Sequence, residues 1–151
     1  MKPAFLIFFF AGILFLLEIS TGAYLFLEKY GFSVDKATEY ITGNPEKFIP
    51  KKSIHGLLEI HFPHFFAVFI SIFVILHFFY FFKIRAIYFF LSFFLFIFGF
   101  LNIISPFLIL YNAGFSILKI ISFSVFFFLF TFTVIILIIL TVNRLIEKCQ
   151  I

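Results

Sequence analysis

The sequence is poor in charge, cysteine, methionine and tryptophan. Only 12% of its 151 residues are charged, against about a quarter in an ordinary soluble domain. The single cysteine, Cys149, excludes an internal disulfide and the paired cysteines of the usual zinc sites. There is no glycine-rich nucleotide-binding loop, and no basic stripe indicates a nucleic-acid partner. These absences argue against most soluble functions.

Apolar residues take the place of the missing charge. Hydrophobic residues make up 64% of the chain, 32 residues are phenylalanine, and the mean hydropathy is +1.24. A folded domain of this length leaves about a third of its chain surface in contact with the solvent. A surface this apolar would aggregate in water, so the lipid bilayer is the expected surroundings and the first expected partner.

Four apolar runs are long enough to cross a bilayer, which takes about 20 residues in a helix. They are residues 4–27, 54–82, 86–110 and 120–142. The runs predict an all-α, polytopic membrane protein, a bundle of about four transmembrane helices that forms a single membrane domain over residues 1–151. The first run also resembles a cleaved signal peptide, so both its retention and its removal stay open.

The only sizeable polar segment, residues 28–53, joins the first two runs. Ser33 is a suitable N-cap for a short helix, and Gly43 is a suitable end for it. The apolar residues of this helix would share one side, which predicts an interfacial helix lying against the membrane: Val34, Ala37 and Ile41.

The basic residues indicate an orientation, although their numbers on the two sides are nearly equal. One side combines short tails and a tight turn with a single opposing acid, Glu147. We therefore expect an integral protein of the cell membrane with both termini in the cytoplasm. The basic residues on that side are Lys2, Lys83, Arg85, Arg144 and Lys148.

Polar side chains inside the apolar runs are the candidate functional residues, because an ionisable group in lipid needs a partner, a cavity or a role. Counted along antiparallel helices, Glu18, His64 and Asn102 reach a similar depth, and His61 shares a helix face with His64. Pro63 would free a backbone carbonyl beside them. These residues predict a partly hydrated polar cluster.

The cluster has three interpretations that the sequence leaves open. Glu18 with His61 and His64 could bind a divalent metal, since imidazoles at i and i+3 with a carboxylate suit zinc. The same residues could handle protons. Alternatively, Glu18 and a histidine could form a structural hydrogen bond between two helices, with small Gly22 allowing a neighbouring helix to come close.

Histidines in an apolar bundle also raise the possibility of haem b. His64 and His77 are about 20 Å apart along one helix, but thirteen steps of about 100° turn them away from a common face. Every histidine lies in or beside one run, and the only methionine is Met1. A second chain would have to supply the facing ligand, so the sequence requires no cofactor and leaves metal and haem b as alternatives.

Three functional classes follow from these observations. The small size and the lack of a soluble catalytic domain favour an accessory or assembly subunit of a membrane complex, working with other membrane subunits or as a homo-oligomer, and argue against an enzyme. A small transporter or proton-conducting protein that uses the Glu and His residues is the second class. A redox or metal-dependent membrane enzyme is the third.

Overall fold

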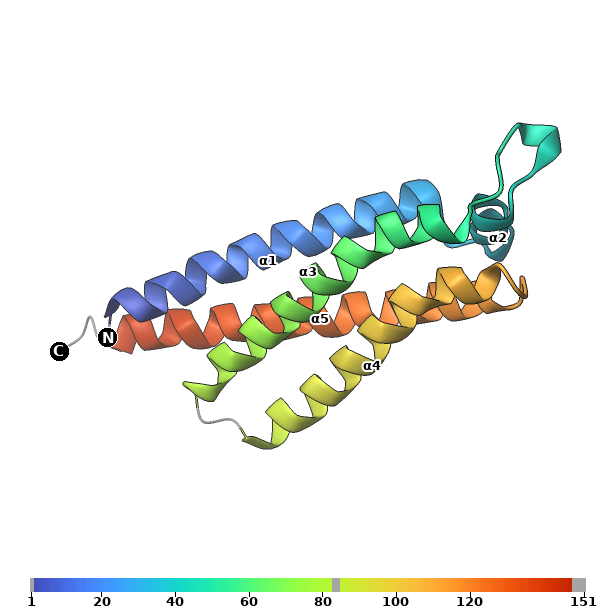
Figure 1. Cartoon of the computed structure of the whole chain (residues 1–151). Coiled ribbons are helices and arrows are strands. Elements are labelled where there is room, and N and C mark those ends of the chain that lie inside the picture. The colour runs from blue at the N-terminus through green and yellow to red at the C-terminus, as the bar shows by residue number, and fades with distance from the viewer. Residues whose placement is uncertain (1, 83–84, 148–151) are drawn as a thin grey trace.

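A computed structural model describes residues 2–82 and 85–147, and in them the chain is all-α (Figure 1). Four helices are long and apolar enough to cross a membrane, and a short helix stands in the first loop, which confirms the predicted fold class. The helices are α1 (Lys2–Lys29), α2 (Val34–Thr42), α3 (Ile54–Tyr80), α4 (Arg85–Ile109) and α5 (Phe115–Glu147), with a 3-10 turn, η1, at Pro45–Lys47.

The predicted span boundaries agree with the helices to within two residues, except for the last span, whose start and end both fall five residues inside α5. The sequence puts that start at residue 120, whereas α5 begins at Phe115 and carries Lys119 inside it. In a sequence, a lysine predicts the end of a membrane span because its charge is costly in lipid. Here the ammonium group finds acceptors on α4, so the helix includes it.

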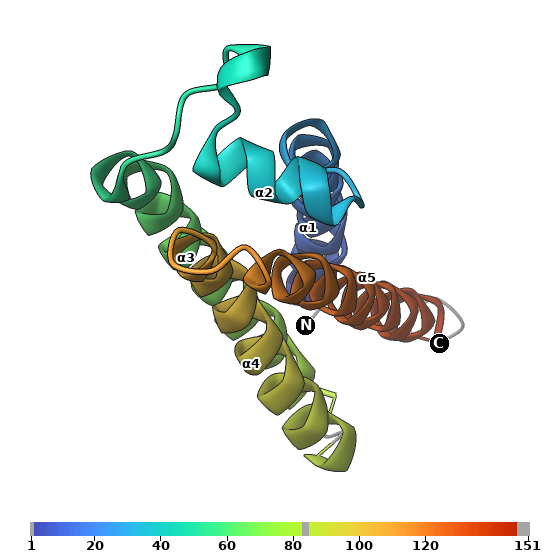
Figure 2. The ribbon, with the colours of Figure 1, turned by 90° about the vertical axis from the view of Figure 1, so that its right-hand side faces the viewer.

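Helix α5 is the centre of the packing. It runs antiparallel beside α1 and α4, while α3 packs mainly against α4 (Figures 1 and 2). Within the described residues, α1 and α3 have no more than marginal backbone contact. One end of the bundle therefore brings together the start of α1 and the end of α5 (Figure 1).

The tightest approach between two spans is at Gly12 of α1. A Cβ atom placed there would lie 2.6 Å from Ile138 Cγ1 on α5. Lipid tails are as apolar as the side chains, so packing rather than water exclusion holds such helices together, and a glycine lets the backbones come close. The predicted close approach at Gly22 is not observed, because a Cβ there would meet nothing within 4 Å.

The short helix α2 closes one end of the bundle (Figure 2). Ser33 caps it as expected, and Gly43 ends it with a φ of +80°, a conformation that suits glycine. Ala37 and Ile41 are fully buried, so the apolar side of α2 packs on the ends of the spans. The Thr38 hydroxyl is 2.7 Å from the Ser116 hydroxyl, which ties α2 to the start of α5.

Two basic residues on which the predicted orientation depends cannot be placed. Lys83 and Lys148 lie outside the described residues, as does Cys149. The cytoplasmic location of the termini stays a prediction.

Candidate ligand pocket in the membrane domain

The four predicted polar residues line one pocket of about 440 Å³ between α1, α3, α4 and α5. Glu18 comes from α1, His61 and His64 come from α3, and Asn102 comes from α4. Tyr40 of α2 lines the end of the pocket that α2 covers. The four side chains share a cavity, but Glu18 and His64 do not lie at the same level as the sequence predicted, because Glu18 faces Ser71, seven residues beyond His64 on α3.

Glu18 is bonded to a serine rather than to a histidine. The Ser71 hydroxyl on α3 is 3.0 Å and 2.9 Å from the two carboxylate oxygens of Glu18, to which it donates. Ser71 lies seven residues beyond His64, on the same helix face and two turns deeper. The expected bond between Glu18 and a histidine is thus replaced by a link that joins α1 to α3 at the deep end of the pocket.

His61 has protein partners for both ring nitrogens. Its Nδ1 is 2.9 Å from the Leu57 carbonyl, which can only accept, so Nδ1 carries the proton in this arrangement. Nε2 is then free to accept from the Tyr30 hydroxyl at 3.5 Å, a long hydrogen bond. Burial raises the pKa of Tyr30, which keeps this hydroxyl protonated and able to donate.

The predicted metal ligands do not form a metal site in the described part of the chain. Glu18, His61 and His64 line the same pocket, but no three His, Cys, Asp or Glu side chains among the described residues are grouped closely enough to hold an ion. His61 is occupied by the helix backbone and Tyr30, whereas His64 is exposed.

Lys119 also lines the pocket, although it was not among the predicted site residues. Its side chain is 5% exposed, and its Nζ donates to the Asn102 carbonyl at 2.8 Å and to Asn102 Oδ1 at 2.7 Å. The Nζ also lies 4.8 Å from the ring centroid of Tyr30 and 5.9 Å from that of Phe26. Such positions allow cation–π attraction.

Pro106 explains why the Asn102 carbonyl is available. In a regular helix the N–H of residue 106 would donate to that carbonyl, but proline has no N–H. Lys119 supplies a donor instead, and the Ser105 hydroxyl adds another at 3.1 Å. The proline that frees the carbonyl bound by Lys119 is therefore Pro106 of α4, and not the predicted Pro63 of α3.

The helical spacing of the inward-facing residues on α5 could have predicted that Lys119 faces the pocket. It lies on the stripe of α5 that faces the other helices, three residues after Ser116 and four before Phe123, both of which are buried. A lysine on the inward stripe of an apolar helix needs acceptors from a neighbouring helix, and Asn102 is the nearest amide on the preceding span.

The pocket opens sideways between α1 and α3. Glu18 and Thr21 on α1 and His64 and Ala67 on α3 line it and are exposed. Its inner wall is aromatic: Phe26 and Phe123 stack with a centroid distance of 3.7 Å and an interplanar angle of 3°, and further phenylalanines follow along α5. In a bilayer, this opening faces the hydrocarbon.

A family model describes this architecture. The model Aq_1264_TM, a transmembrane helical domain, matches residues 31–148. The chain belongs to this family of transmembrane helical domains. It is a multi-pass integral membrane protein. No curated protein and no solved structure matches the chain.

The matched segment contains most of the pocket lining. Residues 31–148 include α2 to α5, and so His61, His64, Asn102 and Lys119. Glu18 is on α1, outside the segment. The lysine and asparagine pair therefore belongs to the transmembrane domain that defines the family, and α1 adds the wall that carries Glu18.

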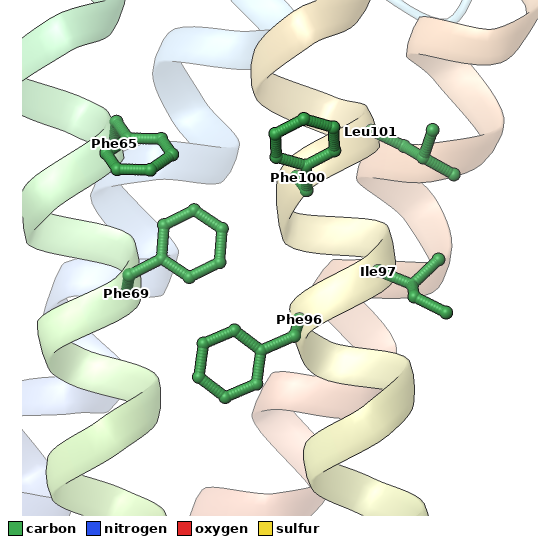
Figure 3. A pocket seen from close by; sticks show the side chains of 6 residues that line it. All are labelled: Phe65, Phe69, Phe96, Ile97, Phe100 and Leu101. Atoms are coloured by element: carbon green, nitrogen blue, oxygen red, sulfur yellow. The ribbon is translucent and has the colours of Figure 1, made fainter.

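A second pocket, of about 540 Å³, lies between α3 and α4 and has no polar lining side chain (Figure 3). Figure 3 shows rings from both helices around it. It contains no group for chemistry or charge recognition, so the pocket with Lys119 is the candidate functional site. The lining residues of the apolar pocket are Phe65, Phe69, Phe96, Ile97, Phe100 and Leu101.

Proposed function

We propose that this multi-pass membrane protein binds a small amphiphilic molecule, which enters the pocket from the bilayer between α1 and α3. The observation that carries the proposal is the polar end of this laterally open pocket, where Asn102 and Lys119 stand against aromatic walls. Apolar cavities with a few converging polar groups are typical ligand sites.

The pocket volume supports a ligand of modest size. A volume of about 440 Å³ is near the lower end of the range for small-molecule sites, about 300–1,000 Å³. Such a space suits an amphiphile with one chain. The polar group of the ligand would lie at the end covered by α2, and its chain would lie along α1 and α3 toward Glu18.

The arrangement favours binding over conduction across the membrane. Beyond the Glu18–Ser71 bond, the space between the helices is filled mainly by a packed apolar core, and the buried hydroxyls of Thr133 and Thr141 donate to carbonyls of their own helix. A transport path would need polar or hydrated positions through this half as well. The core residues in this half include Ile75, Leu76, Phe79, Val134 and Leu137.

A photoactivatable fatty acid with a diazirine in its chain tests the proposal. The protein is reconstituted in phosphatidylcholine nanodiscs, crosslinked, and mapped by mass spectrometry. Gly22→Phe fills the pocket without a clash at Cβ, since nothing lies within 4 Å of that position. Leu14→Phe is the matched control, because Leu14 is on the same helix, 65% exposed, and does not line the pocket.

We expect crosslinks to concentrate on the pocket lining and to fall about tenfold in Gly22→Phe, as expected for a loss of about 1.4 kcal/mol of binding free energy. The Leu14→Phe variant should crosslink as the unmodified protein does. Crosslinks spread evenly over the lipid-facing side chains, with no effect of Gly22→Phe, would overturn the proposal.

A further inference from the structure

We infer that the ligand of this pocket has an anionic head, a carboxylate or a phosphate, that is held at Lys119. The inference rests on the proposed function and adds the chemical class of the ligand. It starts from the charge balance of the pocket. Lys29 and Lys119 both line it, whereas its acidic lining residue is Glu18.

The charge of Lys119 has no counter-charge nearby. Within the described residues, Lys119 forms no ion pair with a carboxylate. Its acceptors are the neutral oxygens of Asn102. A buried ammonium group without an opposite charge is costly, and a ligand anion removes that cost.

The acid of the pocket is too deep to serve as this counter-charge. Glu18 accepts from Ser71, which is ten residues beyond His61 on α3, or about 15 Å at 1.5 Å per residue. Lys119, by contrast, is within the first turns of α5, beside Tyr30 and the covered end of the pocket. The two charges therefore stand at opposite ends of the cavity.

The pocket that Lys119 lines contains further hydrogen-bond donors. Asn102 turns Oδ1 toward Lys119, so its Nδ2 amide faces away from it, and among the described residues Nδ2 donates to no protein acceptor. Lys29 and Tyr40 also line the pocket. Several donors lining one pocket favour a ligand oxygen that accepts, and charge-assisted bonds of this kind are the stronger ones.

The position of Lys119 and Lys29 along the spans suits an anionic head group. Lys119 is four residues into α5, about 6 Å from its start, and Lys29 ends α1. The head would thus lie near the end of the spans, where polar groups are normally found, while the chain points inward along the lateral opening. A one-chain acid lying in this direction keeps its carboxylate or phosphate at the lysines and its tail in the hydrocarbon.

Three photoactivatable probes that share one diazirine-bearing chain test the head group: the fatty acid, the alkyl phosphate and the fatty alcohol. Saturation of crosslinking in phosphatidylcholine nanodiscs, in mildly alkaline buffer, gives an apparent affinity for each. We expect at least one anionic probe to bind about tenfold more tightly than the alcohol, which corresponds to about 1.4 kcal/mol. The better anion identifies the head.

Substitutions of Lys119 and Lys29 test whether these lysines cause the tighter binding of the anionic probe. Lys119→Met should reduce the preference for the anion to near onefold, and Lys119→Arg should retain part of it. Lys29→Gln, at the partly exposed end of α1, should reduce it severalfold and stays informative if Lys119→Met fails to fold. Lys47→Gln removes a charge that does not line the pocket and should leave the preference unchanged.

The two proposals fail in distinguishable ways. Equal binding of all three probes, still blocked by Gly22→Phe, would overturn the anionic head and leave the pocket as a binding site. Crosslinking that Gly22→Phe does not affect would overturn the pocket itself. An anion preference that survives both Lys119→Met and Lys29→Gln would show that other groups select the head, and it would also overturn the inference.

Discussion

Lys119 and Pro106 act on the same oxygen atom from two different helices. Proline takes a backbone donor away from the Asn102 carbonyl, and lysine supplies another at 2.8 Å. The Ser105 hydroxyl also donates to this carbonyl, so the loss of one donor costs only part of the about 1–3 kcal/mol of a fully unsatisfied buried group. The bond from Lys119 to this carbonyl depends on the proline, whereas its bond to Asn102 Oδ1 does not, and the two residues are therefore testable as a pair.

We predict a coupling between Lys119→Met and Pro106→Ala. Alanine at 106 returns an N–H to the Asn102 carbonyl, so Lys119→Met should destabilise the Pro106→Ala background less than the original, by about 1 kcal/mol. The cost of burying the lysine charge cancels in the comparison, since both backgrounds carry it. Reversible unfolding in mixed detergent and SDS micelles measures the four free energies of unfolding.

Pro63→Ala provides the control for this cycle. Pro63 is inside α3, and replacing it returns a donor to a carbonyl of α3, away from Lys119. Lys119→Met should then cost the same with and without the change. A coupling of equal size with Pro63→Ala would mean that helix straightening, rather than the Asn102 carbonyl, links the residues.

The polar residues of the pocket were predictable from the sequence to different degrees. Glu18, His61, His64 and Asn102 stand out because polar groups are costly inside long apolar runs. The same rule predicted that Lys119 lies outside the last span. The prediction was wrong because the acceptors of Lys119 are on α4, and a contact between two helices cannot be seen in the sequence.

At the scale of helices, the number and type of the spans were predictable because the bilayer sets their length. Their packing order was not. Small residues beside Glu18 indicated a close neighbour at Gly22, whereas the close contact is at Gly12, against Ile138 of α5. Both are glycines in one apolar helix, and only the three-dimensional path of α5 distinguishes them.

This difference predicts opposite effects for two alanine substitutions. Gly12→Ala puts a Cβ 2.6 Å from Ile138 Cγ1, an inner atom of that side chain, so α1 or α5 must shift. We expect a loss of about 1–3 kcal/mol, as for other overpacked positions. Gly22→Ala meets open space and should be neutral or slightly stabilising, because alanine favours a helix more than glycine does.

Thermal unfolding of the two variants in detergent checks this prediction. Gly12→Ala combined with Ile138→Ala, which removes the clashing atoms, should lose less than the sum of the two single changes. Equal melting temperatures for Gly12→Ala and Gly22→Ala would contradict the proposed seam between α1 and α5.

The loop that follows α2 predicts a small dependence of stability on pH. Lys47 and Asn44 donate to the Glu39 carboxylate, and these bonds lower the pKa of Glu39. A lowered pKa contributes stability above the ordinary range of Glu, and this contribution is lost as the pH falls through the folded value. Glu39→Gln should therefore lower the melting temperature slightly at neutral pH and have less effect in acid.

Lys36 offers a comparison for the pH series. It donates to the Leu27 carbonyl, an acceptor that does not titrate. Lys36→Gln should thus change the melting temperature by the same amount throughout the acid range. If Glu39→Gln also changed the melting temperature by the same amount at every pH, the ion pair between Glu39 and Lys47 would not contribute to the pH dependence of stability.

At the scale of the whole molecule, the protein is a bundle with its pocket at one end. Helix α2 covers that end, and the opposite end brings together the beginning of α1 and the end of α5 (Figure 1).

That the protein is an accessory or assembly subunit of a membrane complex stays a prediction. Co-purification of a stoichiometric partner under mild detergent from the native source tests it.

Four spans require the termini to share one side of the membrane and the loop before α3 to lie on the other. Labelling with a membrane-impermeant maleimide in sealed vesicles tests this arrangement. The first reporter is Cys149, the single cysteine, which follows the described end of α5 at Glu147. The second is Glu46→Cys on η1, introduced together with Cys149→Ser.

We expect each vesicle orientation to label one of the two reporters and not the other, and detergent to make both reactive. In inverted vesicles, labelling of Cys149 alone would support the predicted cytoplasmic termini, whereas labelling of the η1 reporter alone would reverse the orientation and keep the four spans. If both were labelled from the same side, an even number of crossings would lie between the two reporters, so α3, α4 and α5 would not all span the bilayer. The pocket would then lose the arrangement of four spans on which its lateral opening to lipid depends.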